Sequence, residues 1–189
     1  MKHLLWNALL LAGLAGCAKN EQATPTVPAN TLRLTVKGQP VTFPASAATV
    51  VLSNRGTQWC LTAKATDATR AGIQVTAFSS GASLEEPGRY AATPPGSTGG
   101  AYSEYGYRVL ADFKNACGTT IYQNGYITYN TGVIPAGLPD TLPEFTLTIV
   151  TVDAAAHTMS GSFAGTYWKG CDKLDIADGQ FNLPYTVQP

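Results

Sequence analysis

The sequence predicts an all-β domain, a single antiparallel β-sandwich or β-barrel, on two observations. The 189-residue chain has 13% charged residues, 19 glycines and nine tyrosines, a composition typical of β-rich extracellular domains. From Thr31 onward, short runs of alternating apolar and polar residues are separated by Gly, Pro, Ser and Asn clusters. Twelve basic residues balance twelve acidic ones, so the chain is not expected to bind nucleic acid.

Residues 1–16 predict an export signal. Lys2 and His3 form a short basic start, and the run Leu4–Leu14 is almost entirely apolar. An apolar run of about ten residues suits a signal peptide, because a membrane-spanning helix needs about twenty. The following Leu14-Ala15-Gly16-Cys17 resembles the lipobox of bacterial lipoproteins. The resemblance implies acylation of Cys17 and a membrane partner held through that lipid; the alternative is an ordinary secretory signal with a chance cysteine.

Residues 17–30 are expected to form the lipidated cysteine and a flexible tether. Ala18–Asn30 is polar, contains Pro25 and Pro28, and shows no apolar periodicity. These thirteen residues span at most about 45 Å when extended. The residue after Cys17 is alanine and not aspartate, which by resemblance to lipoprotein sorting favours the outer membrane. Whether the domain faces the periplasm or the cell surface stays open.

Residues 31–189 are expected to form the β domain. Leu32, Leu34 and Val36 alternate with polar residues, which predicts a half-buried strand. Lys37-Gly38-Gln39-Pro40 then turns the chain into a partner strand that begins at Val41. Further strands are predicted at Thr49–Leu52, Gln58–Ala65, Ile73–Phe78, Tyr107–Phe113, Ile121–Tyr129, Phe145–Val152, Met159–Trp168 and Leu174–Tyr185.

Two long segments lack strand patterning. Ser79–Gly106 and Thr131–Glu144 are both rich in Gly and Pro. Loops longer than about twelve residues are uncommon unless they are functional or mobile. The two segments are therefore predicted to be recognition loops, with loops that bind no partner as the alternative.

The C-terminal third carries a second resemblance. Met159–Phe163 reads MSGSF, and Ile176–Tyr185 reads IADGQFNLPY. This pairing resembles the ending of a family of uncharacterised lipoproteins of the Bacteroidota type. The resemblance implies a calycin-like β-barrel or a β-sandwich and supplies no catalytic residues. Both runs alternate, and their apolar faces predict that Phe163 and Phe181 lie in the core.

Candidate catalytic residues are sparse. His157 lies in a predicted hairpin turn, and Gly161–Gly165 has its serine one position too early for a Gly-x-Ser-x-Gly nucleophile elbow. Glu85 and Glu86 could be paired carboxylates for glycoside hydrolysis, but that reaction needs carboxylates about 5–10 Å apart across a cleft. Adjacent loop glutamates are more simply solvated. The sequence therefore predicts no catalytic residue, no cofactor and no enzyme activity.

Three aspartates in the C-terminal region could bind a metal ion. Asp172, Asp175 and Asp178 recur at every third position before Gly179, whereas an EF-hand loop reads D-x-D-x-D-G with a later glutamate. This spacing disfavours calcium, and no metal ligand is predicted. Asp178-Gly179 is instead expected to form a tight β-turn.

Tyrosines are dense in the middle of the chain. Exposed aromatic rings can stack on sugars or protein partners, because they combine a large apolar surface with a polar group. Strands also use tyrosine for packing alone, which is the favoured interpretation. The residues concerned are Tyr102, Tyr105, Tyr107, Tyr122, Tyr126 and Tyr129.

With Cys17 lipidated, three cysteines remain, and export to an oxidising compartment predicts a disulfide. The separations between Cys60, Cys117 and Cys171 match no metal-ligand motif. Counting the predicted strands as alternately up and down places Cys60 and Cys117 at the same end of the fold, so Cys60–Cys117 is the predicted pair. One additional short strand, such as Tyr90-Ala91, would reverse this parity.

Together these features predict an outer-membrane lipoprotein with a non-catalytic role in binding or in envelope structure. Its ligand could be a glycan, a protein or a small apolar molecule. One alternative is a calycin-like carrier, which would need an apolar cavity above about 300 Å³. The other is a carbohydrate-active hydrolase, which would need two carboxylates facing each other across a groove. A filled core with an exposed aromatic patch would favour the binding module.

Overall fold

The chain folds almost entirely into β-strands. The computed structural model describes residues 27–56, 58–67, 71–93, 97–108, 113–114, 120–122, 126–131 and 144–189. In these ranges the one helix is a 3-10 turn, η1 (Ala45–Ala47), and no helix has the length and hydropathy needed to cross a membrane. Cys17 and the predicted signal peptide lie outside the described residues. The all-β prediction is confirmed, and the first strand begins at Thr31.

The strands are β1 (Thr31–Val36), β2 (Gln39–Pro44), β3 (Ala48–Arg55), β4 (Gln58–Thr66), β5 (Ala71–Ser80), β6 (Gly88–Ala91), β7 (Gly99–Arg108), β8 (Phe113–Lys114), β9 (Thr120–Tyr122), β10 (Tyr126–Asn130), β11 (Phe145–Asp153), β12 (Thr158–Lys169) and β13 (Asp172–Gln188). Eleven of them form one mixed sheet in the order β2-β1-β13-β3-β4-β5-β7-β10-β12-β11-β6, and β8 pairs with β9.

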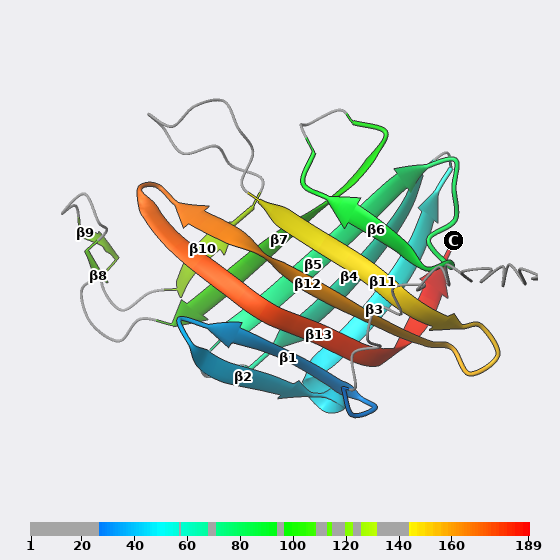
Figure 1. Ribbon diagram of the computed structural model, residues 1–189, viewed down its shortest axis with the longest axis horizontal. Coiled ribbons are helices and arrows are strands. Elements are labelled where there is room, and N and C mark those ends of the chain that lie inside the picture. Colours follow the sequence, from blue (N-terminus) through cyan, green and yellow to red (C-terminus); the bar gives the residue numbers. More distant parts are fainter. Residues whose placement is uncertain are drawn as a thin grey trace, which may run out of the picture.

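The large sheet folds over into two layers. β13 also pairs with β12, so the pairings close a ring from β13 through β3, β4, β5, β7, β10 and β12 back to β13. Figure 1 shows β3, β4, β5 and β7 as one layer, crossed in front by β13, β12, β11 and β6. All pairings between these strands are antiparallel except the one between β3 and β13, which is parallel.

β13 joins the two layers because it changes pairing partners along its length. It pairs with β12 and β1 along most of its length, and its last residues, Tyr185–Gln188, pair with β3. The register of both β1 and β12 shifts beside Asp178, which has a φ of 51°. An extra residue on one strand with a left-handed φ is a β-bulge, which bends the strand. The predicted turn at Asp178-Gly179 is therefore wrong, because this Asp-Gly pair lies at a bulge within a continuous strand.

Most predicted strands are present, but one predicted loop is not. Ser79–Gly106 contains β6 and most of β7, and β7 ends at Arg108 where the sequence predicted a strand to begin. The buried inward residues of β7 are Ala101, Ser103 and Tyr105, so its first half has no large apolar side chain that would reveal a strand. The other predicted recognition loop, Thr131–Glu144, lies outside the described residues except at its two ends.

Side chains from both layers fill the space between them. Alternate residues of each strand point inward, as the period of two requires. Phe163 and Phe181, predicted to be core residues, are 2% and 0% exposed. The largest fully buried side chains are Tyr129, Tyr167, Phe43, Phe181, Leu32, Leu34, Leu52, Leu61, Ile73, Leu84 and Leu147.

Two glycines let phenylalanine rings lie against the neighbouring strand. Gly161 pairs with Phe181, and Gly179 pairs with Phe163. A Cβ atom at Gly161 would lie 2.5 Å from two ring atoms of Phe181 and 2.6 Å from the backbone oxygen of Thr148. The backbone oxygen is held in the sheet and cannot rotate away as a side chain can. Gly161 is therefore required by packing.

We expect Gly161→Ala to lower the free energy of unfolding by about 1–3 kcal/mol, the usual cost of overpacking a core. Urea denaturation followed by tryptophan fluorescence would measure the loss. Ser162→Ala is the control, because Ser162 lies on the opposite face of β12 and lines a different surface groove. Its replacement should change the free energy of unfolding by no more than about 0.5 kcal/mol. An unchanged denaturation midpoint for Gly161→Ala would contradict the close packing of the Phe181 ring against Gly161.

The predicted Cys60–Cys117 disulfide is wrong, because Cys60 is a free cysteine. Cys60 lies on β4, where its sulfur atom is 3.9 Å from Thr62 Oγ1. Cys171, in the turn between β12 and β13, is disulfide-bonded, and its partner lies outside the described residues, as does Cys117.

Candidate binding surface

Polar side chains cover the outer face of the layer that contains β4, β5 and β7. Leu61 and Ala63 of β4 are buried in the core, so Lys64 points outward from the same strand. The same alternation turns Gln74 of β5 and Glu104 of β7 outward. In the register of the sheet Lys64 pairs with Gln74, and Gln74 pairs with Glu104. We call these three residues the polar row.

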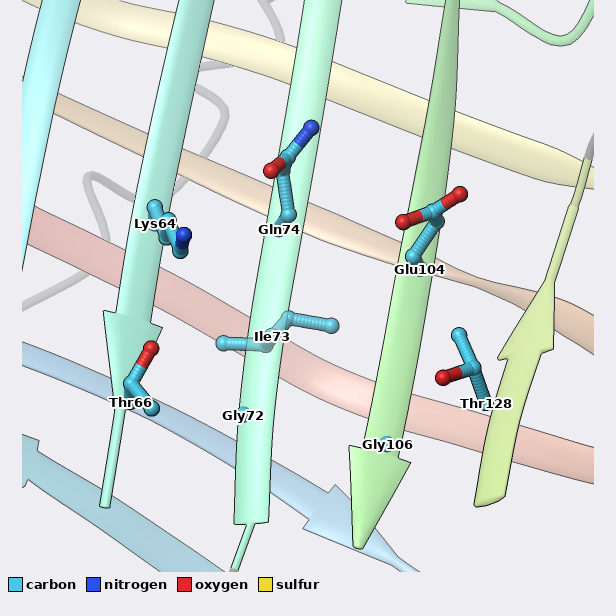
Figure 2. Close-up of a pocket in the computed structure, with 8 residues that line it drawn as sticks. All are labelled: Lys64, Thr66, Gly72, Ile73, Gln74, Glu104, Gly106 and Thr128. Atoms are coloured by element: carbon cyan, nitrogen blue, oxygen red, sulfur yellow. The ribbon is translucent and has the colours of Figure 1, made fainter. Parts of the chain in front are cut away.

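A second row beside it is low, because its two central residues have no side chains. Gly72 of β5 pairs with Gly106 of β7, and Thr66 and Thr128 flank the two glycines on β4 and β10. We call these four residues the glycine row. The two rows border an open groove of about 270 Å³, the outer groove (Figure 2), lined by Lys64, Thr66, Gly72, Ile73, Gln74, Glu104, Gly106 and Thr128.

The polar row has hydrogen-bonding groups that the fold leaves free. In the described part of the chain, the side chains of Lys64, Gln74 and Glu104 make no hydrogen bond or ion pair with another residue. Lysine only donates, an ionised glutamate only accepts, and the glutamine amide does both. The Cα atoms of Lys64 and Glu104 are two strand spacings apart, about 10 Å, with Gln74 between them (Figure 2).

Tyr102 extends this surface with an aromatic ring. It precedes Glu104 by two residues on β7, so both side chains point to the outer face. Its side chain is 39% exposed, one of two large apolar residues exposed to this degree in the described ranges. Along the strand, a spacing of two residues is about 7 Å. The outer groove therefore has an accessible aromatic ring beside its polar row.

The other described tyrosines of this region pack inside. The rings of Tyr105 and Tyr107 are 6.2 Å apart, and those of Tyr107 and Tyr129 are 6.0 Å apart and stacked. Burial, and secondarily the hydrogen bond between the Tyr107 and Tyr129 hydroxyls, raises the pKa of Tyr129 far above its ordinary value. The packing interpretation is thus confirmed for these three residues. The side chains of Tyr122 and Tyr126 lie outside the described residues.

A buried hydrogen-bond relay holds the sheet beneath the groove. The hydroxyl of Tyr167, on β12, donates to Ser103 Oγ at 2.7 Å, and Ser103 Oγ donates to the backbone oxygen of Gln74 at 2.7 Å. Burial raises the pKa of Tyr167 although the bond to Ser103 acts in the opposite direction, so the hydroxyl stays neutral. A satisfied buried network of this kind rigidifies its surroundings. The relay therefore fixes the backbone that carries Gln74.

No family model, curated protein or solved structure matches the chain. Membership of the lipoprotein family that the C-terminal motifs resemble stays a prediction.

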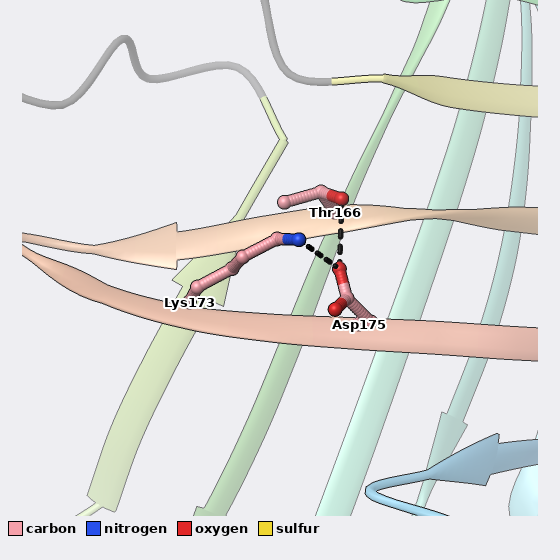
Figure 3. A network of polar contacts seen from close by, with 3 residues as sticks. All are labelled: Thr166, Lys173 and Asp175. Atoms are coloured by element: carbon pink, nitrogen blue, oxygen red, sulfur yellow. Dashed lines mark hydrogen bonds and ion pairs between the residues drawn. The ribbon is translucent and has the colours of Figure 1, made fainter. Parts of the chain in front are cut away.

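A second groove lies on the outer face of the other layer. Asp175 lies in an ion pair with Lys173 Nζ at 3.2 Å and accepts a hydrogen bond from Thr166 Oγ1 at 2.8 Å (Figure 3). The carboxyl side chain is 64% exposed, so the ion pair adds only about 0–1 kcal/mol. The groove measures about 460 Å³ and is lined by Arg89, Glu144, Phe145, Thr146, Ala164, Gly165, Thr166, Asp175 and Ile176.

The candidate catalytic residues line neither groove. His157 lies in the exposed turn before β12, with its ring 5.6 Å from that of Tyr185, and it makes no hydrogen bond with a described residue through its side chain. Glu85 accepts a hydrogen bond from the Tyr185 hydroxyl at 3.5 Å, and Glu86 is exposed. Within the described ranges, no serine or cysteine is hydrogen-bonded to the His157 side chain.

The three aspartates do not gather at one point. Residues three apart on a strand face opposite sides, so Asp172 and Asp175 of β13 point away from each other. Asp178 lies at the bulge and lines a groove on the outer face together with Gln180. In the described part of the chain, no three His, Cys, Asp or Glu residues come close enough to hold a metal ion.

Sequence reasoning missed the polar row. Lys64 and Gln74 lie in predicted strands, where they are two of the polar residues that alternate with apolar ones. Glu104 lies in a predicted loop. The alternation of each strand shows which side chains point outward. Which of them become cross-strand neighbours depends on the register between the strands. The residue pattern within one strand does not determine that register.

Proposed function

We propose that the protein is a lipid-anchored module of the cell envelope that binds its ligand without catalysis, through the outer groove. The polar row carries this proposal, because three hydrogen-bonding side chains lie together on a rigid sheet without partners in the described protein. Binding sites combine a concave shape with a few fixed polar groups. The resemblance of Leu14–Cys17 to a lipobox supports the anchor.

A carrier of an apolar ligand has less support. Such a protein needs an internal space, and the centre of this fold is filled by large side chains such as Tyr129, Tyr167 and Phe181. The grooves described above open outward on the two outer faces instead. Both carry charged side chains, such as Lys64 and Glu104 in one and Glu144 and Asp175 in the other, which suit a ligand that can form hydrogen bonds.

A hydrolase is the second candidate, because Glu144 and Asp175 line the same groove. Hydrolysis of a glycosidic bond needs one carboxyl group that keeps its proton near neutral pH, which burial commonly provides. Both residues are exposed, and Asp175 already pairs with Lys173. This groove therefore supports catalysis less well than the outer groove supports binding.

The anchor predicts a specific covalent modification. Mass spectrometry of the membrane fraction should show a mature chain that begins at Cys17 and carries acyl groups. Cys17→Ala should abolish acylation and processing at this site, whereas Cys60→Ala should leave both unchanged. A mature protein that begins at Met1, or that has an unmodified Cys17, would refute the anchor.

Binding and catalysis can be separated with one panel of probes. We expect the full-length protein to bind at least one of a set of oligosaccharides, dipeptides and fatty acids, and to leave it unchanged after long incubation. Gly72→Val would place a side chain in the outer groove and should weaken that binding about tenfold or more. Turnover that Glu144→Gln abolishes would refute a non-catalytic role. Fatty-acid binding that Gly72→Val leaves intact would favour the carrier.

A further inference from the structure

We infer that the outer groove takes a neutral saccharide as its ligand. This inference rests on the proposed binding function and adds the chemical class of the ligand. It follows from two properties of the groove, its balance of charge and its mixture of donors and acceptors, and from the exposed aromatic ring beside its polar row.

The charge balance of the outer groove disfavours ligands with a large net charge. Lys64 and Glu104 are the two charged residues among those that line it, and their charges are opposite. Phosphate and sulfate ligands are usually bound by clusters of basic residues, and cations by several carboxylates. A groove with one charge of each sign has no such preference. It suits a ligand that is neutral overall.

The donor and acceptor pattern fits adjacent hydroxyl groups. A hydroxyl both donates and accepts, so it can donate to Glu104, accept from Lys64, and do either with the Gln74 amide. Bonds to the two charged groups are the stronger ones. The three side chains follow one another at strand spacing, about 4.8 Å apart at the backbone. Thr66 and Thr128 add hydroxyls at the two ends of the glycine row.

Tyr102 adds the surface that a sugar ring needs besides hydrogen bonds. One face of a sugar ring is made of C–H groups, and aromatic rings provide an apolar surface with a polar edge for such faces. Tyr102 lies on the same face as Glu104 and is 39% exposed. Gly72, which is partly exposed, has no side chain that would keep a ring away from the backbone of β5. At about 270 Å³, the groove is at the lower limit of small-molecule sites, which suits a short part of an oligosaccharide.

A zwitterionic ligand such as a peptide is the nearest rival, because it could use Lys64 and Glu104 as two ion-pairing sites. In an amino acid or a dipeptide, the two charged groups lie at most about 7 Å apart, whereas these two residues have Cα atoms about 10 Å apart. A zwitterion also leaves the aromatic ring of Tyr102 without a role. The saccharide uses all the groups present.

The test is calorimetric titration of the full-length protein in a polyoxyethylene detergent, which has no sugar headgroup. The probes are cellohexaose, maltohexaose, laminarihexaose and hexa-N-acetylchitohexaose as neutral saccharides, polygalacturonate as an acidic one, and dialanine as a zwitterion. We expect at least one neutral hexasaccharide to bind, with an affinity that changes less than about twofold between low and moderate salt, since no net charge is neutralised.

Three variants locate the site. Glu104→Gln should weaken saccharide binding about tenfold or more, because it removes a charged acceptor. Gly72→Val should also weaken it about tenfold or more, and Tyr102→Ala about two- to tenfold. Glu86→Gln is the matched control for the charge change, since Glu86 is exposed and lies outside the groove, and it should leave the affinity unchanged. Thermal melts would confirm that each variant is folded.

Each outcome decides between the claims. Binding of dialanine or polygalacturonate alone, lost in Gly72→Val, would overturn the saccharide and leave the proposed binding function in place. Saccharide binding that both Glu104→Gln and Gly72→Val leave intact would overturn the outer groove as the site. Failure of all four neutral hexasaccharides to bind would overturn the inference.

Discussion

Replacing Phe163 by alanine should lower the free energy of unfolding by about 3–5 kcal/mol. The ring is 2% exposed and lies in the core between the two layers. Two of its carbon atoms are 2.5 Å from the place where Gly179 would carry a Cβ atom, so the ring lies directly over the backbone of β13. Truncation would leave a cavity that the hydrogen-bonded strands cannot close.

Equilibrium denaturation in urea would measure this loss. Phe163→Leu is a useful second variant, because it keeps most of the apolar volume and should recover a large part of the stability. Tyr102→Ala is the exposed-ring control and should cost much less, since its ring is already 39% exposed. A loss below about 1 kcal/mol for Phe163→Ala would mean that the ring does not lie in the core.

Removing the disulfide at Cys171 should have an effect of similar size. Cys171 is bonded and Cys60 is free, and Cys17 is the predicted lipid carrier, so we predict that Cys171 pairs with Cys117. A bond between these positions closes a loop whose entropy corresponds to about 4 kcal/mol of stability. Cys171→Ser should therefore lower the free energy of unfolding by about that amount.

Peptide mapping under non-reducing conditions would identify the partner. We expect one linked peptide that contains Cys117 and Cys171, and a separate peptide in which Cys60 can be alkylated after denaturation. Cys60→Ser is the control and should leave the melting temperature almost unchanged. A linked peptide that contains Cys60, or three free thiols in exported protein, would contradict the prediction.

The sequence predicted strands best where apolar and polar residues alternate strictly. The predicted strand of Leu32, Leu34 and Val36 matches β1, and the predicted strand Met159–Trp168 differs from β12 by one residue at each end. The sequence did not predict most of β7, because its inward positions include Ala101 and Ser103. These small residues do not produce a clear alternation of apolar and polar residues. The same strand carries Tyr102 and Glu104, so this part of the candidate site could not be predicted either.

By itself, the sequence determined that this chain forms strands and which face of most of them is apolar. Those properties depend on a period of two that is visible within a few residues. Only the tertiary structure decided that Lys64, Gln74 and Glu104 become neighbours, that the last residues of β13 pair with β3 and so join the layers, and that Cys60 stays free. These outcomes depend on strand register and layer closure, which are set by contacts between residues far apart in the chain.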